Sequence, residues 1–451
     1  MAELLRKWYR SRLFPVYTAM LILLGHITGF DVPFGAVLVV TVIPGLFVMH
    51  ELNFLMAPLM MISFIVTARG FDLATTTYAQ YGKMPYLGIM IVGIGLLILA
   101  AVWYVIRHWK MARKIEFHGL IVGMTIFCVA MFCNGFFNPR YTAMNLWFGF
   151  VIQLSIFLPY LLIAFFGRFE KQDLENFLYC LMVTGLLVLA ELIAAYFTTV
   201  QFIDGKPVKE SVVTGWGVWT TIGEMLTFLM PACFYFAYSH RHGWIGYLLG
   251  AAMWGGTVLS QSRGALVMGT LMLAACLCTV CVAGKNKKRN RIYTAILGGM
   301  GLVGCLILWK KLRVILQNFL DYGFGDNGRF DLWKIGWGHF KQFPVFGSGF
   351  YDSYVSEWNV VITPYLYHNT IVQMLAACGL VGLIAYLFHR VQTVVQVVRK
   401  PNARKTFLGL CILGLILSSL LDVLFFKIYP TVIYGLILLF LEKSEEESRF
   451  E

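Results

Sequence analysis

The stretch 86–106, YLGIMIVGIGLLILAAVWYVI, contains 21 residues and no charged side chain. A helix needs about 20 consecutive apolar residues to cross the ~30 Å hydrocarbon core of a bilayer. Over such a length in lipid, a helix pairs its own backbone groups, whereas open strands and irregular loops leave them unpaired. The stretch therefore predicts a transmembrane helix.

Comparable apolar runs recur along the whole chain. They predict fourteen helices, at residues 15–30, 33–50, 52–68, 86–106, 117–134, 147–167, 176–197, 218–238, 244–259, 264–283, 292–309, 367–388, 406–421 and 425–441. Only 13% of the residues are charged and the mean hydropathy is +0.73, whereas a soluble domain has about 25% charged residues. We therefore predict an all-α fold, a polytopic transmembrane bundle of 12–14 helices that forms a single domain, 1–451, in the lipid bilayer.

The basic residues indicate how this bundle is oriented. With the N-terminus inside, 23 of the 36 Lys and Arg residues fall in the inner segments 1–14, 107–114, 168–175, 239–243, 284–291, 389–405 and 442–451. Cytoplasmic loops carry an excess of Lys and Arg, so we expect both termini in the cytoplasm. This clustering between apolar runs accounts for the net charge of +13, and we expect no nucleic-acid partner.

One connection, residues 310–366, is long enough to fold by itself, and the predicted topology places it outside the membrane. Within it Phe330, Trp333, Trp337 and Phe340 recur at helical spacing. This pattern predicts an amphipathic helix that lies at the interface or packs on the bundle. The long outer loop is thus expected to carry amphipathic helical structure.

Arg263 is the first candidate for a functional charge, since charged groups near membrane depth are costly. It lies in SQSRGA, residues 260–265, a turn that the topology places at the outer face. A guanidinium beside hydroxyl groups and a glycine suits an anion pocket, and Ser262 belongs to the predicted pocket. The structural alternative is an Arg whose side chain extends to the interface.

Arg329 and His368 are two further candidates in the predicted outer region. Arg329 precedes the amphipathic segment, where a helix N-terminus would also favour an anion. His368 precedes Asn369 at the expected outer start of a helix, and a neutral imidazole can act as a base near neutral pH. The structural alternatives are an ordinary loop Arg and a hydrogen-bonded polar His.

Four other polar residues, and two motifs that the sequence lacks, also bear on the predicted function. Glu191 and Glu224, within predicted helices, could assist a base or pair with an Arg, and Asp422 is expected to pair with Lys427 near an outer turn. The chain has no Gly-rich nucleotide loop and no carboxylates at metal-ligand spacing in its outer segments. We therefore expect a lipid-linked donor reached from the membrane, with no cofactor and no metal.

Taken in order, these motifs resemble the O-antigen ligase and O-antigen polymerase (Wzy-type) family, membrane glycosyltransferases of bacterial surface polysaccharide assembly. The resemblance covers about residues 250–390 and is carried by SQSRGA at 260–265, GRFDLW at 328–333, PVFGSG at 344–349, His368-Asn369, Gly379 and Gly382. In one departure, the Asn that many relatives carry near Gly223 and Glu224, before Pro231, is absent.

The resemblance implies roles for the candidate residues and partners. Arg263, Arg329 and Ser262 would bind the donor pyrophosphate, and His368 would be the general base, with supporting residues Asn369, Glu224 and Glu191. The donor would be a glycan on undecaprenyl pyrophosphate, and the acceptor a glycan hydroxyl. The site would face outward from the bacterial cytoplasmic membrane, beside other polysaccharide-assembly membrane proteins.

The predicted function is that of a metal-independent, inverting glycosyltransferase that moves a lipid-linked glycan onto an acceptor hydroxyl in lipopolysaccharide or exopolysaccharide assembly. A ligase and a polymerase differ in the acceptor, and we favour the ligase slightly. The alternative from another class is a transporter (flippase) of lipid-linked oligosaccharides. Transporters typically show inverted repeats and charges near the bilayer midplane, and neither is evident in this chain.

Overall fold

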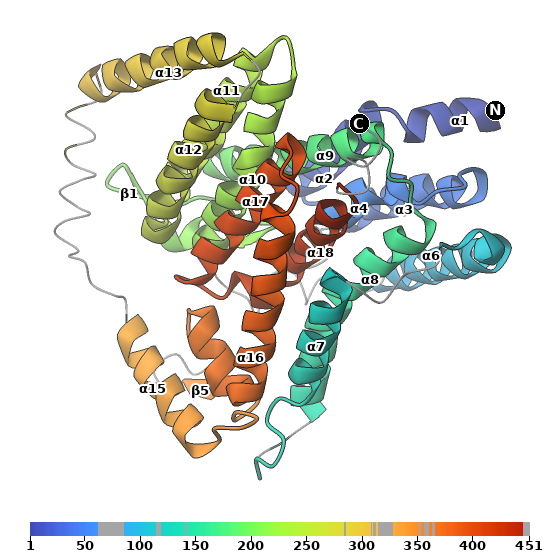
Figure 1. Cartoon of the computed structure of the whole chain (residues 1–451), viewed down its shortest axis with the longest axis vertical. Helices are drawn as coiled ribbons and strands as arrows, with labels where there is room; N and C mark the ends of the chain where they lie inside the picture. Colours follow the sequence, from blue (N-terminus) through green and yellow to red (C-terminus); the bar gives the residue numbers. More distant parts are fainter. Residues whose placement is uncertain are drawn as a thin grey trace.

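The computed structural model describes residues 1–61, 85–113, 119–139, 141, 143–283, 286–307, 309, 313, 328–350, 353–355, 360–362 and 366–444. This described part is mainly helical (Figure 1). It contains sixteen α-helices: α1 (Ala2–Tyr9), α2 (Leu13–Thr28), α3 (Asp31–Val48), α4 (Met56–Met60), α6 (Tyr86–His108), α7 (Leu120–Phe132), α8 (Ala143–Phe166), α9 (Lys171–Thr198), α10 (Trp219–Ser239), α11 (Gly243–Leu259), α12 (Arg263–Ala283), α13 (Lys287–Ile307), α15 (Arg329–Gln342), α16 (Thr370–Val398), α17 (Ala403–Ser419) and α18 (Ile428–Lys443).

The short elements are single turns and small hairpins. The 3-10 helices of the described chain are η1 (Asn53–Leu55), η3 (Trp109–Met111), η4 (Lys209–Ser211) and η5 (Leu424–Phe426). Three antiparallel hairpins pair β1 (Phe202–Ile203) with β2 (Lys206–Pro207), β3 (Val213–Thr214) with β4 (Gly217–Val218), and β5 (Ser353–Val355) with β6 (Val360–Ile362). Four of these strands and η4 lie between α9 and α10, in a segment that the sequence predicts to be outside the membrane.

The predicted all-α class is confirmed. Each of the fourteen predicted helices overlaps an observed helix, and α15 occupies the segment predicted to be amphipathic. The range 52–68 overlaps α4, and its remainder from residue 62 lies outside the described residues. Helix α1 was not predicted, because its eight residues contain Glu3, Arg6 and Lys7 and therefore do not resemble a membrane span.

Six helices in the described ranges are long and apolar enough to cross a membrane: α3, α6, α8, α9, α12 and α16. Helices α1 and α2 would together form a seventh span, bent by 76°. Helices α7, α11, α17 and α18 have 13 to 17 residues, shorter than the ~20 that a full crossing requires. A described helix thus overlaps each predicted span, but only six or seven of the described helices are long and apolar enough for a full crossing.

Helix α10 forms the centre of the bundle. Sixteen of its 21 residues are buried, which is typical of a helix that is covered on all sides. It packs against α9, α11, α12 and α17, and Figure 1 shows α10, α11, α12 and α17 side by side. Helix α10 therefore packs against helices from both halves of the chain.

The predicted inner segments meet at one end of α10. Glu175 lies 3.9 Å from both Arg12 and Arg404, and Arg289 donates to the backbone carbonyl of Arg241. The N-termini of α10, α12 and α16, at residues 219, 263 and 370, lie at the opposite end. With a rise of 1.5 Å per residue, the 21 residues of α10 separate the two ends by about 30 Å.

Helix α16 is broken at Gly379, and the turn after α15 fills the break. Gly379 has φ 64°, a left-handed conformation that favours glycine. Across the break, Ser348 and Gly349 donate their N–H groups to the carbonyls of α16, while Leu380 and Val381 donate to the carbonyls of Pro344 and Val345. The glycine-rich motif thus pairs backbone groups that a helix break would otherwise leave unsatisfied.

Candidate functional site

A histidine–aspartate pair lies at the N-terminal end of α16. His368 Nδ1 is 2.9 Å from Asp422 Oδ1, and the side chain of His368 is 41% exposed whereas that of Asp422 is 2% exposed. A buried carboxylate that accepts a hydrogen bond from Nδ1–H fixes the ring orientation and leaves the lone pair on Nε2. The pair therefore presents an accessible basic nitrogen.

Asp422 is held in its charged form by neighbouring donors. Burial raises the pKa of its carboxyl, but the Lys427 ammonium and the His368 hydrogen bond outweigh that effect, so the pKa lies below its ordinary value. Lys427 Nζ donates to Asp422 Oδ2 at 3.0 Å and to Thr221 Oγ1 at 2.7 Å. The predicted pairing of Asp422 with Lys427 is confirmed, and it links α10, α16 and α18.

The backbone around His368 is tightly specified. His368 has φ 49°, a conformation that is uncommon for a residue with a Cβ and is often found at functional sites. The next residue, Asn369, caps α16 by accepting from the N–H groups of Ile371 and Val372 and donates to the carbonyl of Leu420. Asn369 therefore positions His368 against the segment that carries Asp422.

Arg263 is the first residue of α12. The preceding turn is fixed by Ser262, whose Oγ accepts from the N–H of Ala265 at 3.3 Å, the arrangement of an N-cap. A Cβ on Gly223 of α10 would lie 2.5 Å from Ser260 Oγ and from Ala265 Cβ, so glycine allows α10 to contact the turn closely. The predicted pyrophosphate contact of Ser262 stays a prediction, since its described hydroxyl contact is structural.

Arg329 is the first residue of α15, and it is half-buried. Helix α15 is attached to the start of α16, because His339 Nδ1 lies 2.7 Å from Tyr367 Oη. A Cβ on Gly336 would clash with Val372 and Tyr367, so this glycine permits the close packing. The helix that carries Arg329 is therefore fixed to the residue next to His368.

Electrostatic interactions connect these separate helix starts. Arg329 interacts with Glu224 and with Lys427, which binds Asp422. Lys209 in η4 interacts with both Arg263 and Arg329. We call Lys209, Arg263, Arg329, His368, Asp422 and Lys427 the cation site. The structure thus brings together the three residues that the sequence indicated first, at the N-terminal ends of α10, α12, α15 and α16.

The two candidate carboxylates differ in location. Glu224, 3% exposed, adjoins the cation site, where it interacts with Asp422, Lys427 and Arg329. The Glu191 carboxylate instead accepts from the N–H of Gly215 at 3.2 Å and lies 4.0 Å from His26. These described contacts give Glu191 a structural role, in which it fixes the β3–β4 hairpin to α9.

Sequence reasoning did not single out Lys209, and it treated Asp422 only as part of an ion pair. Both are brought to the site by chain folding, from a hairpin segment and from the turn after α17. One sequence signal was available for Lys209: Lys and Arg are uncommon on the outer side of a membrane protein, and Lys209 lies in a predicted outer segment.

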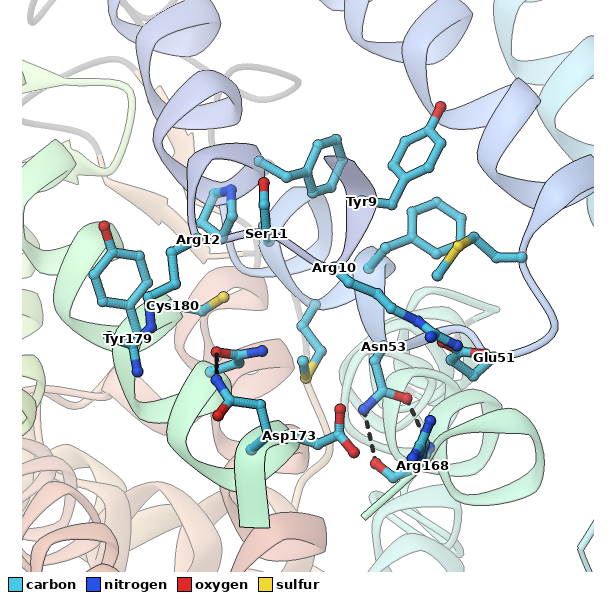
Figure 2. A pocket seen from close by; sticks show the side chains of 18 of the residues that line it. Tyr9, Arg10, Ser11, Arg12, Glu51, Asn53, Arg168, Asp173, Tyr179 and Cys180 are labelled. Atoms are coloured by element: carbon cyan, nitrogen blue, oxygen red, sulfur yellow. Dashed lines mark hydrogen bonds and ion pairs between the residues drawn. The ribbon is translucent and has the colours of Figure 1, made fainter. Parts of the chain in front are cut away.

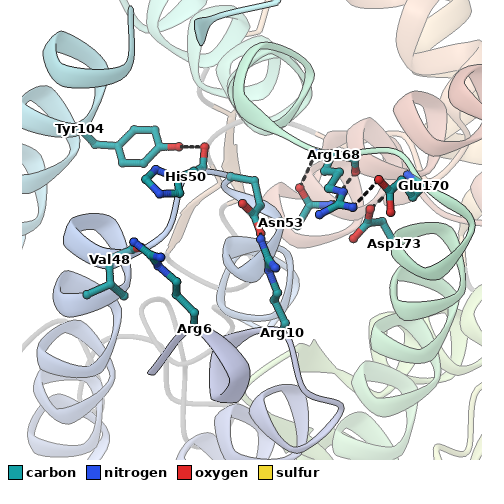
Figure 3. A network of polar contacts seen from close by, with 10 residues as sticks. Arg6, Arg10, Val48, His50, Asn53, Tyr104, Arg168, Glu170 and Asp173 are labelled. Carbon is teal, nitrogen blue, oxygen red and sulfur yellow. Dashed lines mark hydrogen bonds and ion pairs between the residues drawn. The ribbon is translucent and has the colours of Figure 1, made fainter. Parts of the chain in front are cut away.

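A second polar region lies at the opposite end, among α1, α2, α4 and α9 (Figure 2). It surrounds a cavity of about 240 Å³, which we call the N-terminal pocket. Its arginines are paired with carboxylates: Arg10 Nε lies 2.6 Å from Glu51 Oε1, and Arg168 pairs with Glu170. Figure 3 shows the adjoining contacts of Asn53 with the backbone of Arg168.

The fold and the cation site define a multi-pass helical membrane protein with an accessible imidazole beside clustered cations. Residues 248–387 match the family model described as O-antigen ligase. The matched range includes Arg263, Arg329 and His368 and confirms the resemblance over this part of the sequence. A comparison with curated proteins finds no match to the chain.

Proposed function

We propose that this protein is a glycosyltransferase that moves a glycan from a polyprenyl diphosphate, undecaprenyl pyrophosphate, onto an acceptor hydroxyl. The observation that carries the proposal is the exposed imidazole of His368 held by buried Asp422, beside Arg329 and the other cations. Guanidinium groups suit diphosphate oxygens because they donate in a planar fork. A base and an anion site are the two elements that direct displacement from a glycosyl diphosphate requires.

In the proposed reaction, His368 Nε2 accepts the proton of the acceptor hydroxyl as its oxygen attacks the anomeric carbon. The bond from that carbon to the diphosphate oxygen breaks, and its electron pair leaves with the polyprenyl diphosphate. A positioned base contributes about 10²–10⁴ in rate, and preorganised cations stabilise the departing charge. Because attack is opposite to the leaving group, the anomeric configuration inverts.

The proposed site lies on the outer face of the cytoplasmic membrane. In support, the basic inner segments gather at one end of α10, through contacts such as Arg404 with Glu175, whereas Arg263 and His368 belong to the other end. By the positive-inside rule, the basic end is cytoplasmic. A lipid-linked donor would then reach the cation site from the outer leaflet.

The proposal is tested with purified protein in vesicles, undecaprenyl pyrophosphate-linked glycan and two acceptors offered separately. Transfer to a lipid A–core glycolipid identifies a ligase, which we expect, and transfer to a second lipid-linked repeat identifies a polymerase. Either product should have inverted anomeric configuration, form in the presence of EDTA, and be lost with His368→Ala. Movement of the donor across the vesicle without a new glycosidic bond would identify a transporter and overturn the proposal.

A further inference from the structure

Lys209 occupies a defined place next to the two arginines. It begins η4, between the β1–β2 and β3–β4 hairpins, and it is half-buried. Its Nζ lies 5.0 Å from the centroid of the Trp219 ring, a cation–π contact. Trp219 is the first residue of α10, so the contact fixes the ammonium at the outer end of the central helix.

This end of α10 is also part of the cation site. Thr221, in the first turn of α10, accepts from Lys427, which binds the carboxylate that holds His368. Burial lowers the pKa of Lys209, and the charges of Arg263 and Arg329 lower it further, while Glu210 acts in the opposite direction. Gly223, in the next turn of α10, packs closely against Ser260 and Ala265 on either side of Arg263, so Lys209 and Arg263 belong to the same end of α10.

Repulsion between cations is relieved when an anion binds between them. The carboxylates described nearby have several neighbours: Asp422 Oδ2 lies 3.0 Å from Lys427, Glu224 interacts with Lys427 and Arg329, and Glu210 interacts with Lys209. A diphosphate between Lys209, Arg263 and Arg329 would convert mutual repulsion into three attractive contacts, in a half-buried setting where such contacts are stronger than in bulk water.

We propose that Lys209 is a third cationic ligand of the donor diphosphate and stabilises it most as the glycosidic bond breaks. This inference rests on the proposed function. The diphosphate diester of the donor carries two negative charges, and the departing polyprenyl diphosphate carries a third because it keeps the electron pair of the broken bond. A contact that strengthens as this charge develops raises kcat more than it lowers KM.

The ammonium suits this role because the developing charge moves to a single oxygen. An ammonium is a compact point charge on a flexible stem, whereas a guanidinium is a rigid fork. Arg263 and Arg329 would then hold the ground-state diphosphate, and Lys209 would follow the bridging oxygen as it becomes terminal.

The test compares Lys209→Met with Lys209→Arg and with the matched control Lys206→Met, an exposed lysine of the preceding hairpin. We expect Lys209→Met to lower kcat about tenfold and to weaken inhibition by free undecaprenyl diphosphate about tenfold, the loss of one charge-assisted contact. KM for the donor should change little, Lys209→Arg should recover most of both losses, and Lys206→Met should match the wild type.

A second measurement separates ligand binding from folding. Without ligand, Lys209→Met should melt close to the wild-type temperature, because the lost contacts with Glu210 and Trp219 offset the relief of repulsion from the arginines, and it should reduce the increase produced by undecaprenyl diphosphate. A variant that keeps wild-type kcat and product affinity, or a control that loses as much as Lys209→Met, overturns the inference. If Arg263→Ala abolishes transfer while Lys209→Met does not, only this inference fails, whereas an inactive wild type refutes the proposed function itself.

Discussion

The two polar regions at opposite ends of the bundle differ in how their charges are balanced. In the N-terminal pocket each arginine lies near a carboxylate, as Arg10 lies near Glu51 and Arg168 near Glu170. In the cation site the buried Asp422 pairs with Lys427 and His368, and Lys209 interacts electrostatically with Arg263 and Arg329. The arginines of the first region thus have described carboxylate partners, and we expect the second region to bind an added anion.

A defined cavity alone therefore does not identify which end of the bundle carries the proposed site. The N-terminal pocket has a defined cavity, but its ion pairs have structural roles: Arg10 with Glu51 and Arg12 with Glu175 connect distant segments, and Arg168 with Glu170 is a local pair. Exposed pairs of this kind contribute little free energy each. The cation site instead combines a strained histidine, with φ 49°, and cations at four helix starts.

The largest difference is expected from matched arginine substitutions at the two ends. Arg263→Lys should lower the transfer rate at least about 100-fold, because a point charge does not replace a forked donor at the diphosphate. Arg10→Lys should leave the rate within about twofold, since an exposed ion pair is worth little. Initial rates of glycan transfer by the two purified variants measure these effects. Equal losses of rate would contradict the proposed difference between the two regions.

Asp422→Asn should also reduce transfer strongly. The amide no longer stabilises the imidazolium or selects the Nδ1–H tautomer, so the rate should fall about 100-fold or more, as in other carboxylate-oriented histidines. The predicted loss is in kcat, with donor KM nearly unchanged. A variant whose KM rises while kcat is retained would show that Asp422 shapes the binding site and does not orient the base.

The stability that Asp422 and Lys427 contribute should vary little over the working pH range. The pKa of Asp422 is lowered, so its contribution is present above the unfolded-state value of about 3.9 and is lost only at lower pH. The pKa of Lys427 is raised, because Asp422 and Glu224 outweigh burial, so its contribution persists up to about pH 10. Melting temperatures of wild type and Asp422→Asn should therefore differ by a constant amount between about pH 8 and 9.5, where neither Asp422 nor Lys427 changes charge.

Gly347→Ala should destabilise the support of the cation site. Gly347 has φ 72° and an added Cβ would collide with the backbone of Ala377, so we expect a loss of about 1–3 kcal/mol. Gly338→Ala is the matched control in α15, where nothing lies within 4 Å of the new Cβ, and it should stabilise by about 0.5–1 kcal/mol. Thermal unfolding in detergent compares them, and a neutral Gly347→Ala would contradict the assigned packing.

The smallest effect is expected at the N-terminal pocket. Asn53 exchanges two hydrogen bonds with the backbone of Arg168, each 2.7 Å long. Asn53→Ala should reduce the free energy of unfolding by about 1–2 kcal/mol and leave transfer by the folded protein unchanged. A specific loss of kcat in this variant would indicate that the pocket takes part in the reaction.

The all-α class and helix positions were predictable because apolar periodicity and length are local properties. The amphipathic segment from Phe330 to Phe340 became α15, and the glycine-rich motif near Gly347 became the turn that fills the break at Gly379. Arg263 and His368 could be nominated because each lies at the edge of an apolar run, and Arg329 because it precedes the amphipathic segment. Their roles stay predictions.

The rest of the site depends on contacts between distant segments. Asp422 is 54 positions from His368, and no local pattern selects it from the other outer carboxylates. Lys209 lies at the start of α10, against Trp219, because the segment between two short hairpins brings it there. Glu191 was nominated for its depth in a helix, but that signal does not distinguish a carboxylate of the site from one that binds the N–H of Gly215.

The most direct measurement is the location of a bound donor. Undecaprenyl pyrophosphate with a photoreactive group next to the diphosphate is cross-linked to the wild-type protein, and the labelled peptides are sequenced. The account predicts labels within 209–224, 260–265, 328–332 and 366–369, with competition by unlabelled undecaprenyl diphosphate. Competable labels confined to 9–15, 49–57 and 168–180, around the N-terminal pocket, would contradict it.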